Sequence, residues 1–150
     1  MEYRLLTIND YNAIRDIWNN TEGMGLRNLD DSRRGIEKFL LRNPSSSFIA
    51  LDGEKAVGGI LCGHDGRRGF IYHTCVLSEY RERGVGSRLT ELACKALKRE
   101  GIHKCALLCY KNNEAGNRFW TGKGWERRTD LNYYDFVLNP NNESRKENNS

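Results

Sequence analysis

The sequence has little proline and no long apolar run. Only two of its 150 residues are proline, and no apolar stretch approaches the roughly 18 residues that a membrane-spanning helix needs. The opening residues, MEYRLLTIND, also lack the apolar stretch of a signal peptide. With 10% aromatic residues and 24 basic residues against 20 acidic ones, the chain is not of the disordered class. We expect a soluble, cytoplasmic protein that makes no membrane contact.

Cysteine motifs of the metal-binding kind are missing as well. The five cysteines include no CxxC pair, and none of the three histidines lies at metal-ligand spacing from them. We therefore expect no metal site and reduced, buried cysteines. A nucleophilic cysteine or a disulfide stays open as the alternative, drawn from Cys62, Cys75, Cys94, Cys105 and Cys109.

Charge is unevenly distributed along the chain. The net charge is +4, and residues 81–100 hold six basic side chains against three acidic ones. A solvated helix face explains the later basic residues, Lys95, Lys98 and Arg99. It does not explain why Arg81 and Arg83 lie among glycines at the start of a helix. This placement favours a phosphate-bearing ligand over general nucleic-acid binding. The aromatic and basic platform typical of nucleic-acid binders is missing, so we expect no nucleic-acid partner.

Apolar runs alternate with helical patterns along the first hundred residues. A short strand at residues 3–8 precedes a helix that Asn9 can cap, and Ser32 can cap a second helix that ends before Pro44. Turn sequences at residues 52–54 and 64–69 separate three runs that predict antiparallel strands, at residues 47–51, 55–62 and 69–77. The clearest helix spans residues 84–99, because its apolar side chains form one stripe.

The remaining sequence predicts a strand, a helix and a final strand. Residues 103–110 form a continuous apolar run, as expected of a strand buried on both faces. A short helix over residues 114–121 and a last strand or hairpin over residues 125–138 complete a single domain, residues 1–138. Residues 139–150, NPNNESRKENNS, hold no apolar side chain, and we expect them to form a disordered polar tail.

The segment that carries chemistry is residues 81–87, RERGVGS, between a predicted strand and the clearest helix. Two glycines one residue apart let the backbone approach a ligand, and the first N–H groups of a helix have no acceptor within it. Together with the helix dipole they form a site for phosphate or pyrophosphate. A dinucleotide fingerprint would need glycine where this chain has Leu89, and a P-loop would need a lysine after the second glycine.

Residues 76–86, VLSEYRERGVG, resemble the acyl-CoA-binding motif of the GNAT N-acetyltransferase superfamily. Downstream, Asn113-Glu114-Ala115, Phe119-Trp120 and Gly124-Trp125 resemble the second signature of that family. The resemblance covers residues 3–138. It implies a mixed α/β (α+β) fold with a central, largely antiparallel sheet of six or seven strands, splayed in the middle and flanked by about four helices.

The resemblance also implies where acetyl-CoA, the cosubstrate, binds. Backbone N–H groups at the start of the motif helix would hold the CoA pyrophosphate, and the preceding strand would pair with the pantetheine arm. Asn113 matches an asparagine beside the cofactor, although it is equally a candidate helix N-cap. Trp120 stands where many members have a tyrosine. The implied cofactor-binding residues are Thr74, Cys75, Val76, Arg81, Arg83, Gly84, Val85, Gly86, Ser87, Asn113 and Trp120.

Family chemistry is direct attack of an amine on the acetyl thioester, so a group must accept the proton of the amine. The usual position of this base matches Phe70 or Tyr72, with Tyr72 ordering a water. His73 is chemically better suited, but strand alternation turns it to the opposite face unless a β-bulge re-aims it. An indole cannot deliver a proton, so Trp120 cannot replace the tyrosine that protonates the thiolate. Tyr133 or Tyr134 can substitute, or no acid is needed.

The leading hypothesis is an N-acetyltransferase that moves an acetyl group from acetyl-CoA to a primary amine in a ternary complex. The acceptor is a small molecule, a protein or a peptide, and the enzyme is a monomer or a homodimer. Trp18, Glu22, Met24, Arg27, His64 and Asp65 are candidate acceptor contacts, without a pattern that identifies the acceptor. The alternative function is an acyl-CoA-binding or sensor domain without turnover.

Overall fold

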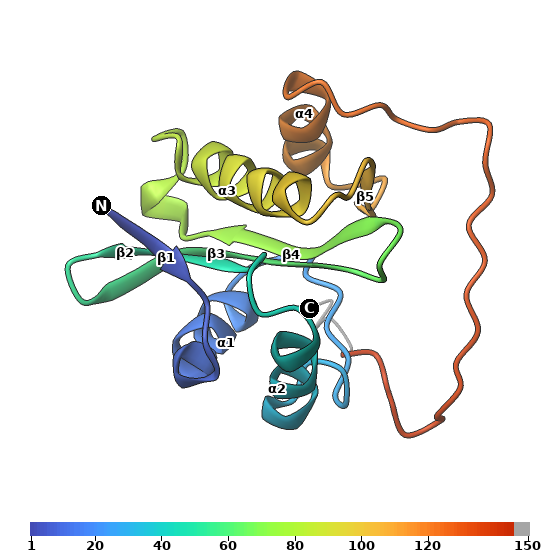
Figure 1. Ribbon diagram of the computed structural model, residues 1–150, viewed down its shortest axis with the longest axis horizontal. Coiled ribbons are helices and arrows are strands. Elements are labelled where there is room, and N and C mark those ends of the chain that lie inside the picture. The colour runs from blue at the N-terminus through green and yellow to red at the C-terminus, as the bar shows by residue number, and fades with distance from the viewer. Residues whose placement is uncertain (146–150) are drawn as a thin grey trace.

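A computed structural model describes residues 1–145. A five-stranded sheet with the order β1-β2-β3-β4-β5 runs through its centre (Figure 1). Neighbouring strands from β1 to β4 are antiparallel to one another, and β5 is parallel to β4. The strands are β1 (Glu2–Leu5), β2 (Phe48–Asp52), β3 (Lys55–His64), β4 (Gly69–Val76) and β5 (Cys105–Leu107).

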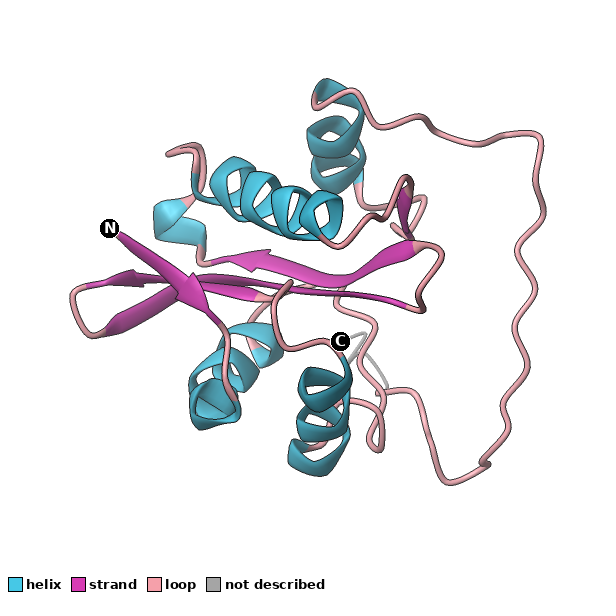
Figure 2. Cartoon of the chain, in the orientation of Figure 1, coloured by secondary structure: helices cyan, strands magenta, loops and turns pink. Residues whose placement is uncertain are grey.

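Helices cover both faces of the sheet (Figure 2). The helices α1 (Tyr11–Asn19) and α2 (Arg33–Arg42) lie on one face, and α3 (Val85–Arg99) and α4 (Glu114–Gly122) lie on the other (Figure 1). Short 3-10 helices, η1 (Ile8–Asp10) and η2 (Ser78–Tyr80), precede α1 and the α3 loop. This mixed α/β arrangement confirms the expected fold class and the number of main helices.

Each face of the sheet has its own apolar core. The α1–α2 side packs Ile14, Trp18 and Ile36 onto Ile49 and Leu61 of the sheet. The other side packs the apolar stripe of α3 onto alternate residues of the same strands, including Val85, Leu89, Ala93, Ile60, Cys62 and Ile71. A sheet covered on both faces needs strands without a polar side, which explains the apolar runs in β2 and β3.

Short polar sequences mark the starts of α1 and α2. The cap predicted for α2 is present, and the cap predicted for α1 is not. The Ser32 hydroxyl accepts a hydrogen bond from the Gly35 N–H at 3.0 Å, so Ser32 caps α2 as expected. The prediction that Asn9 caps the first helix is wrong, because Asn9 lies inside η1. There Asp10 reaches back, and its Oδ2 accepts the Thr7 N–H at 2.9 Å.

A β-bulge in β4 sets which side chains face which core. Ile71 pairs with Cys62 and His73 pairs with Leu61, so Tyr72 is the extra residue of β4 at this point. Ile71 belongs to the core under α3, whereas His73 packs on Trp18 of α1, with ring centroids 4.9 Å apart. The bulge therefore turns His73 to the α1–α2 side, which regular alternation from Ile71 would not do.

The end of the sheet differs from the sequence prediction. The strand β5 has three residues, and its side chains are partly exposed, so the prediction of a doubly buried strand over residues 103–110 is wrong. No strand forms over residues 125–138 in the described chain, and the sheet has five strands rather than six or seven. The two wrong predictions are linked. Without a strand over residues 125–138 beside it, β5 is the edge of the sheet, and its side chains are not covered on that side.

Residues 126–138, which we call the arm, form an extended segment that stands away from the sheet (Figure 1). The chain then returns to the α1–α2 side, where the Arg145 N–H donates to the Leu26 carbonyl at 2.8 Å. The Asn28 N–H donates to the Glu143 carbonyl at 3.0 Å. The predicted tail thus begins with residues that contact the body, and its remainder, residues 146–150, lies outside the described residues. None of the helices over residues 1–145 has the length and apolarity to cross a membrane.

Candidate functional site

The start of α3 presents free backbone N–H groups. Gly84, the residue before the helix, has φ +81°, a left-handed conformation that glycine adopts without steric cost. The first amide bonded within the helix is that of Arg88, which donates to the Gly84 carbonyl at 3.0 Å. Within the described chain no side chain caps this helix, so the N–H groups of Val85, Gly86 and Ser87 remain available to an anion.

Gly86 lies where this helix start meets α4 and β4. A Cβ at Gly86 would stand 3.4 Å from Phe119 Cζ and 3.7 Å from Val76 Cγ2. A methyl group therefore just fits, whereas a branched side chain would press on Phe119 and Val76. A large side chain at position 86 would therefore displace Phe119 or the start of α3 itself.

The two arginines of the loop flank this helix start. Arg81 Nε donates to the Val76 carbonyl at 3.3 Å, so it ties the loop to the end of β4. The Arg83 guanidinium lies over the Tyr80 ring, 5.1 Å from its centroid. Neither arginine has an acidic partner within residues 1–145, and both add positive charge to the helix start.

The sheet opens next to this helix start. Pairing between β4 and β5 ends at Ile71 and Leu107, so the second half of β4 has no neighbour on that side. Thr74 lies in this half, and its Oγ1 is buried without a hydrogen-bond partner in the described chain. A buried hydroxyl without a partner is costly, which makes it a candidate contact for a polar ligand in the opening. Thr74, Cys75 and Val76 are thereby brought to the same place as residues 84–87.

Cys75 is fully enclosed on the α1–α2 side of β4. Its thiol lies 3.7 Å from the Gly59 carbonyl, and burial raises the pKa of the thiol to about 12. A thiol with this pKa stays protonated at neutral pH and is a poor nucleophile. All five cysteines are free, and no cluster of three metal-ligating side chains occurs among the residues that the structure describes.

His73 forms a buried hydrogen-bonded pair with Asp31. The distance from His73 Nε2 to Asp31 Oδ1 is 2.7 Å, and 8% of His73 and 5% of Asp31 are exposed. Asp31 Oδ2 also accepts the Arg27 N–H at 2.7 Å, which fixes the carboxylate in the loop before α2. In the neutral imidazole with Nε2 donating to Asp31, Nδ1 carries no proton, and no residue among 1–145 hydrogen-bonds to it. The pair has the geometry of a base and its orienting group.

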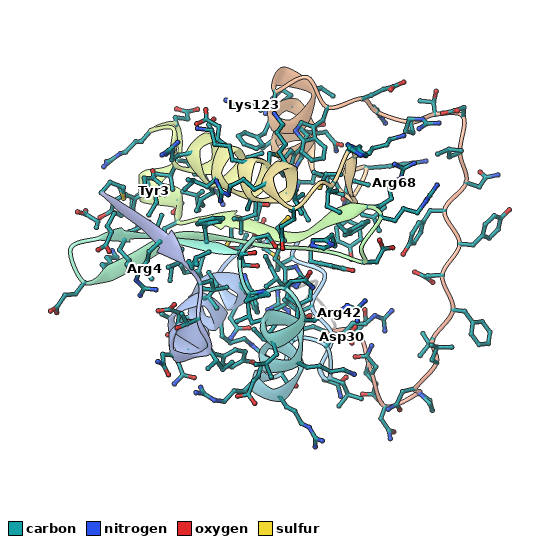
Figure 3. The ribbon with its side chains drawn as sticks, in the orientation of Figure 1. Tyr3, Arg4, Asp30, Arg42, Arg68 and Lys123 are labelled. Atoms are coloured by element: carbon teal, nitrogen blue, oxygen red, sulfur yellow. The ribbon has the colours of Figure 1, made fainter. Side chains whose placement is uncertain are left out.

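Tyr72, the bulged residue, lines a cavity of about 300 Å³ between α2 and the turn from β3 to β4. Its ring contacts Phe70 and Phe39, with centroids 4.7 Å and 5.6 Å apart. Burial, and then the nearby Tyr133, Asp30 and Asp65, raise the pKa of the Tyr72 phenol, so it holds its proton at neutral pH. The cavity mouth carries Arg42 and Arg68, which lie with Asp30 on the side that the arm encircles (Figure 3).

Asn113 and Trp120 have structural roles in α4. Asn113 Oδ1 accepts the Gly116 N–H at 2.9 Å, so Asn113 is the N-cap of α4. Trp120 packs against Phe119 and Trp125, with ring centroids 4.9 Å and 5.1 Å away. These contacts attach α4 to the core under α3 and are compatible with a ligand beside the helix.

A profile described as the acetyltransferase (GNAT) family matches residues 11–125. The chain belongs to the GNAT acetyltransferase family. N-alpha-acetyltransferase 30 of Schizosaccharomyces pombe is 30% identical over 106 residues, which are 67% of this chain and 69% of that protein. An acetyltransferase of Pectobacterium atrosepticum is 30% identical over 115 residues, 77% of this chain and 80% of the relative.

The fold of this GNAT chain is also that of solved acetyltransferases. The structure of AAC(6')-Iy, in complex with the bisubstrate analog CoA-S-monomethyl-acetylneamine, matches it with a TM-score of 0.72 at 18% identity. The match covers 91% of this chain and 98% of AAC(6')-Iy. The family and these relatives identify the protein as an enzyme of the acyltransferase class.

The GNAT fold brings together most, but not all, of the residues that the sequence suggested. Residues 74–76 and 81–87 lie around the opening of the sheet, with His73 on the opposite side of β4. Tyr134 does not join them, because it lies on the arm and is 86% exposed. Asp31 was missed, because it is 42 residues before His73 and no periodic pattern links a loop carboxylate to a strand.

Proposed function

We propose that this enzyme transfers an acetyl group from acetyl-CoA to a primary amine of a small molecule, protein or peptide. The observation that carries the proposal is the free helix start of α3 beside the open half of β4. The N–H groups of residues 85–87 suit the pyrophosphate, and the unpaired edge of β4 suits the amides of the pantetheine arm. Thr74 Oγ1 supplies a hydroxyl that lacks a partner in the protein.

The similar proteins support this choice of cosubstrate and acceptor. AAC(6')-Iy is solved with an analogue that joins CoA to an acetylated aminoglycoside, and the fission yeast relative is named as an N-alpha-acetyltransferase. The neamine part of that analogue is a small molecule, and the NatC complex, another similar structure, is solved with a Gag peptide and CoA. Both classes therefore belong in a screen of acceptors.

The first test measures binding of acetyl-CoA through the melting temperature. A ligand at 100 times its dissociation constant stabilises a protein by about 2.7 kcal/mol, which means a rise on the order of 5–10 °C for a domain of this size. Gly86→Val should reduce this rise to within error, because its branched side chain presses on Phe119 and Val76 and displaces the start of α3. Gly122→Val is the matched control, since a Cβ at Gly122 meets nothing within 4 Å. No rise in the wild type would refute the proposed cosubstrate.

We propose His73 as the base and Asp31 as its positioning residue. A protonated alkylamine has a pKa near 10.4, so its proton must leave before nitrogen attacks the thioester carbon. His73 Nδ1 accepts that proton, the amine nitrogen bonds to the thioester carbon, and the C–S bond breaks so that CoA leaves as a thiolate. The second proton of the amine then passes from the new amide nitrogen to the thiolate or to water. A thiol of pKa about 8.5 leaves without obligatory protonation, so the Trp120 indole is no obstacle.

Substitutions separate this catalytic role from a structural one. His73→Gln should lower kcat on the order of 10²-fold or more and leave the acetyl-CoA melting shift unchanged. Asp31→Asn should lower kcat with little change in KM for acetyl-CoA, and Asp31→Glu should recover part of it. The matched control is the exposed His103→Gln. Wild-type kcat in His73→Gln would exclude the assignment.

The alternative that the sequence left open, binding of acyl-CoA without turnover, rests on one feature and runs against the membership of an acetyltransferase family. Trp120 occupies the tyrosine position of the family motif, and its ring is committed to packing between Phe119 and Trp125. Release of free thiol from acetyl-CoA, measured with a panel of amines, separates the two functions. The panel should include amines that also carry a carboxylate, because Arg42 and Arg68 stand at the cavity mouth. Binding without release for every amine would favour the sensor function.

A further inference from the structure

The arm exposes a dense group of large apolar side chains. Phe136 is 86% exposed and Leu138 is 90% exposed, and the other large apolar side chains of the arm are 48–86% exposed. Single exposed apolar residues are ordinary on a protein surface, but a contiguous set usually marks an interaction site. The exposed set is Leu131, Tyr133, Tyr134, Phe136, Val137 and Leu138.

The sequence of the arm is that of a β-strand buried on both faces. Tyr134, Phe136 and Leu138 point to one face of an extended segment, while Tyr133 and Val137 point to the other, with Asp135 between them. Aromatic and β-branched residues are favoured in strands, and apolar residues on both faces are typical of a strand between two layers. In the described chain, however, the arm pairs with no strand.

The sheet, conversely, has an edge that lacks a strand. The strand β5 pairs only with β4, and no strand among residues 1–145 covers its outer side. Leu108 and Tyr110, which continue β5, are each 55% exposed. Unpaired edges of this kind accept another strand through their free N–H and carbonyl groups.

Both ends of the arm are held by the body, which keeps the arm off its own sheet. Before the arm, the Trp125 N–H donates to the Trp120 carbonyl at 3.1 Å. After it, Arg27 Nη1 donates to the Asn142 carbonyl at 2.8 Å, and residues 143 and 145 bond to residues 28 and 26. Between these anchors the arm forms a wide open loop beside the β5 side of the molecule (Figure 1).

We propose that two copies of this chain exchange their arms. Residues 131–138 of each copy add as a strand to the outer edge of β5 in the other copy. A two-fold axis satisfies both requirements at once, because each chain offers one strand without a neighbour and one edge without a strand. The aromatic side chains of the arm then cover Leu108 and Tyr110 of the partner. This inference concerns assembly and stands whether or not the acetyl-transfer proposal holds.

The first experiment measures the oligomeric state of the full chain by sedimentation equilibrium. We expect a dimer for the wild type, and at least about a 30-fold weaker dimer for Phe136→Asp, because the carboxylate would be buried at the exchanged strand. Leu41→Asp is the matched control, since Leu41 is 77% exposed on α2, and it should remain dimeric. Circular dichroism verifies that both variants are folded. A wild type that is monomeric at every concentration overturns the proposal.

The second experiment distinguishes exchange from simple association. The photo-crosslinking residue p-benzoylphenylalanine replaces Tyr134 in a ¹⁵N-labelled chain, which is refolded together with unlabelled wild-type chain. Native mass spectrometry verifies that the hybrid dimer has formed. After irradiation and trypsin, exchange predicts a crosslink between the labelled peptide 129–145 and the unlabelled peptide 105–111. Crosslinks confined to the labelled chain in the hybrid would show that the arm folds onto its own copy, and would overturn the proposal.

Discussion

Adjacent side chains of β4 lie on opposite faces of the strand, one beside the proposed cofactor site and one in the proposed catalytic pair. Thr74 presents an unpartnered hydroxyl beside the free helix start, while the adjacent His73 is paired with Asp31 on the other face. The sequence alone left Tyr72 and His73 as competing bases, because the choice depends on whether the strand is regular. The bulge decides which faces they occupy, and a bulge leaves no reliable mark in one sequence.

Cys75 offers a test at this scale. Cys75→Ala should retain at least half of the wild-type kcat, because burial holds the pKa of the thiol at about 12 and only the backbone faces the opening. The smaller side chain removes one buried sulfur, so the free energy of unfolding should fall by about 1 kcal/mol. Steady-state kinetics and thermal unfolding measure the two effects. Complete loss of turnover in a folded variant would point to covalent catalysis by cysteine instead.

Among the elements, the start of α1 shows how a short polar signal fixes a helix. Asp10 accepts the Thr7 N–H and is also held by Arg4, whose Nη1 and Nη2 each lie 2.8 Å from its carboxylate oxygens. Hydrogen bonds from Arg4 hold the pKa of this carboxyl below its ordinary value of 3.8. The carboxylate form is therefore favoured in the folded state.

Asp10→Asn should lower the free energy of unfolding by about 1 kcal/mol at pH 7, as loss of a helix cap does. Because the pKa is lowered on folding, the contribution of Asp10 is fully present above about pH 4 and is lost as the pH falls through the folded value. The difference in urea midpoint between wild type and Asp10→Asn should therefore shrink between pH 7 and pH 3. Asp16→Asn, on the exposed side of α1, should match the wild type at both pH values. A constant difference would contradict the assignment to charge.

Over the whole molecule, the sequence predicted what local patterns specify. The three central strands, α3 and the Ser32 cap follow from apolar periodicity and turn residues, and all are confirmed. The end of the sheet was predicted wrongly, because residues 125–138 have the pattern of a strand but a strand also needs a neighbour. Asp31 could not be placed beside His73 either, since only the tertiary fold brings a loop and a strand together.

The bulge at Tyr72 has a consequence for how this strand can change length during evolution. Residues 69 and 71 face α3, and so do residues on the far side of the bulge such as Val76, while Tyr72 and His73 both face the α1–α2 side. Losing the residue at position 72 would leave every other side chain of the strand on its present face. Losing His73 instead would do the same, whereas losing a residue elsewhere inside the strand would exchange the contents of the two cores beyond that point. We therefore expect the loss of one residue from this strand to be tolerated only at the bulge, at residue 72 or 73.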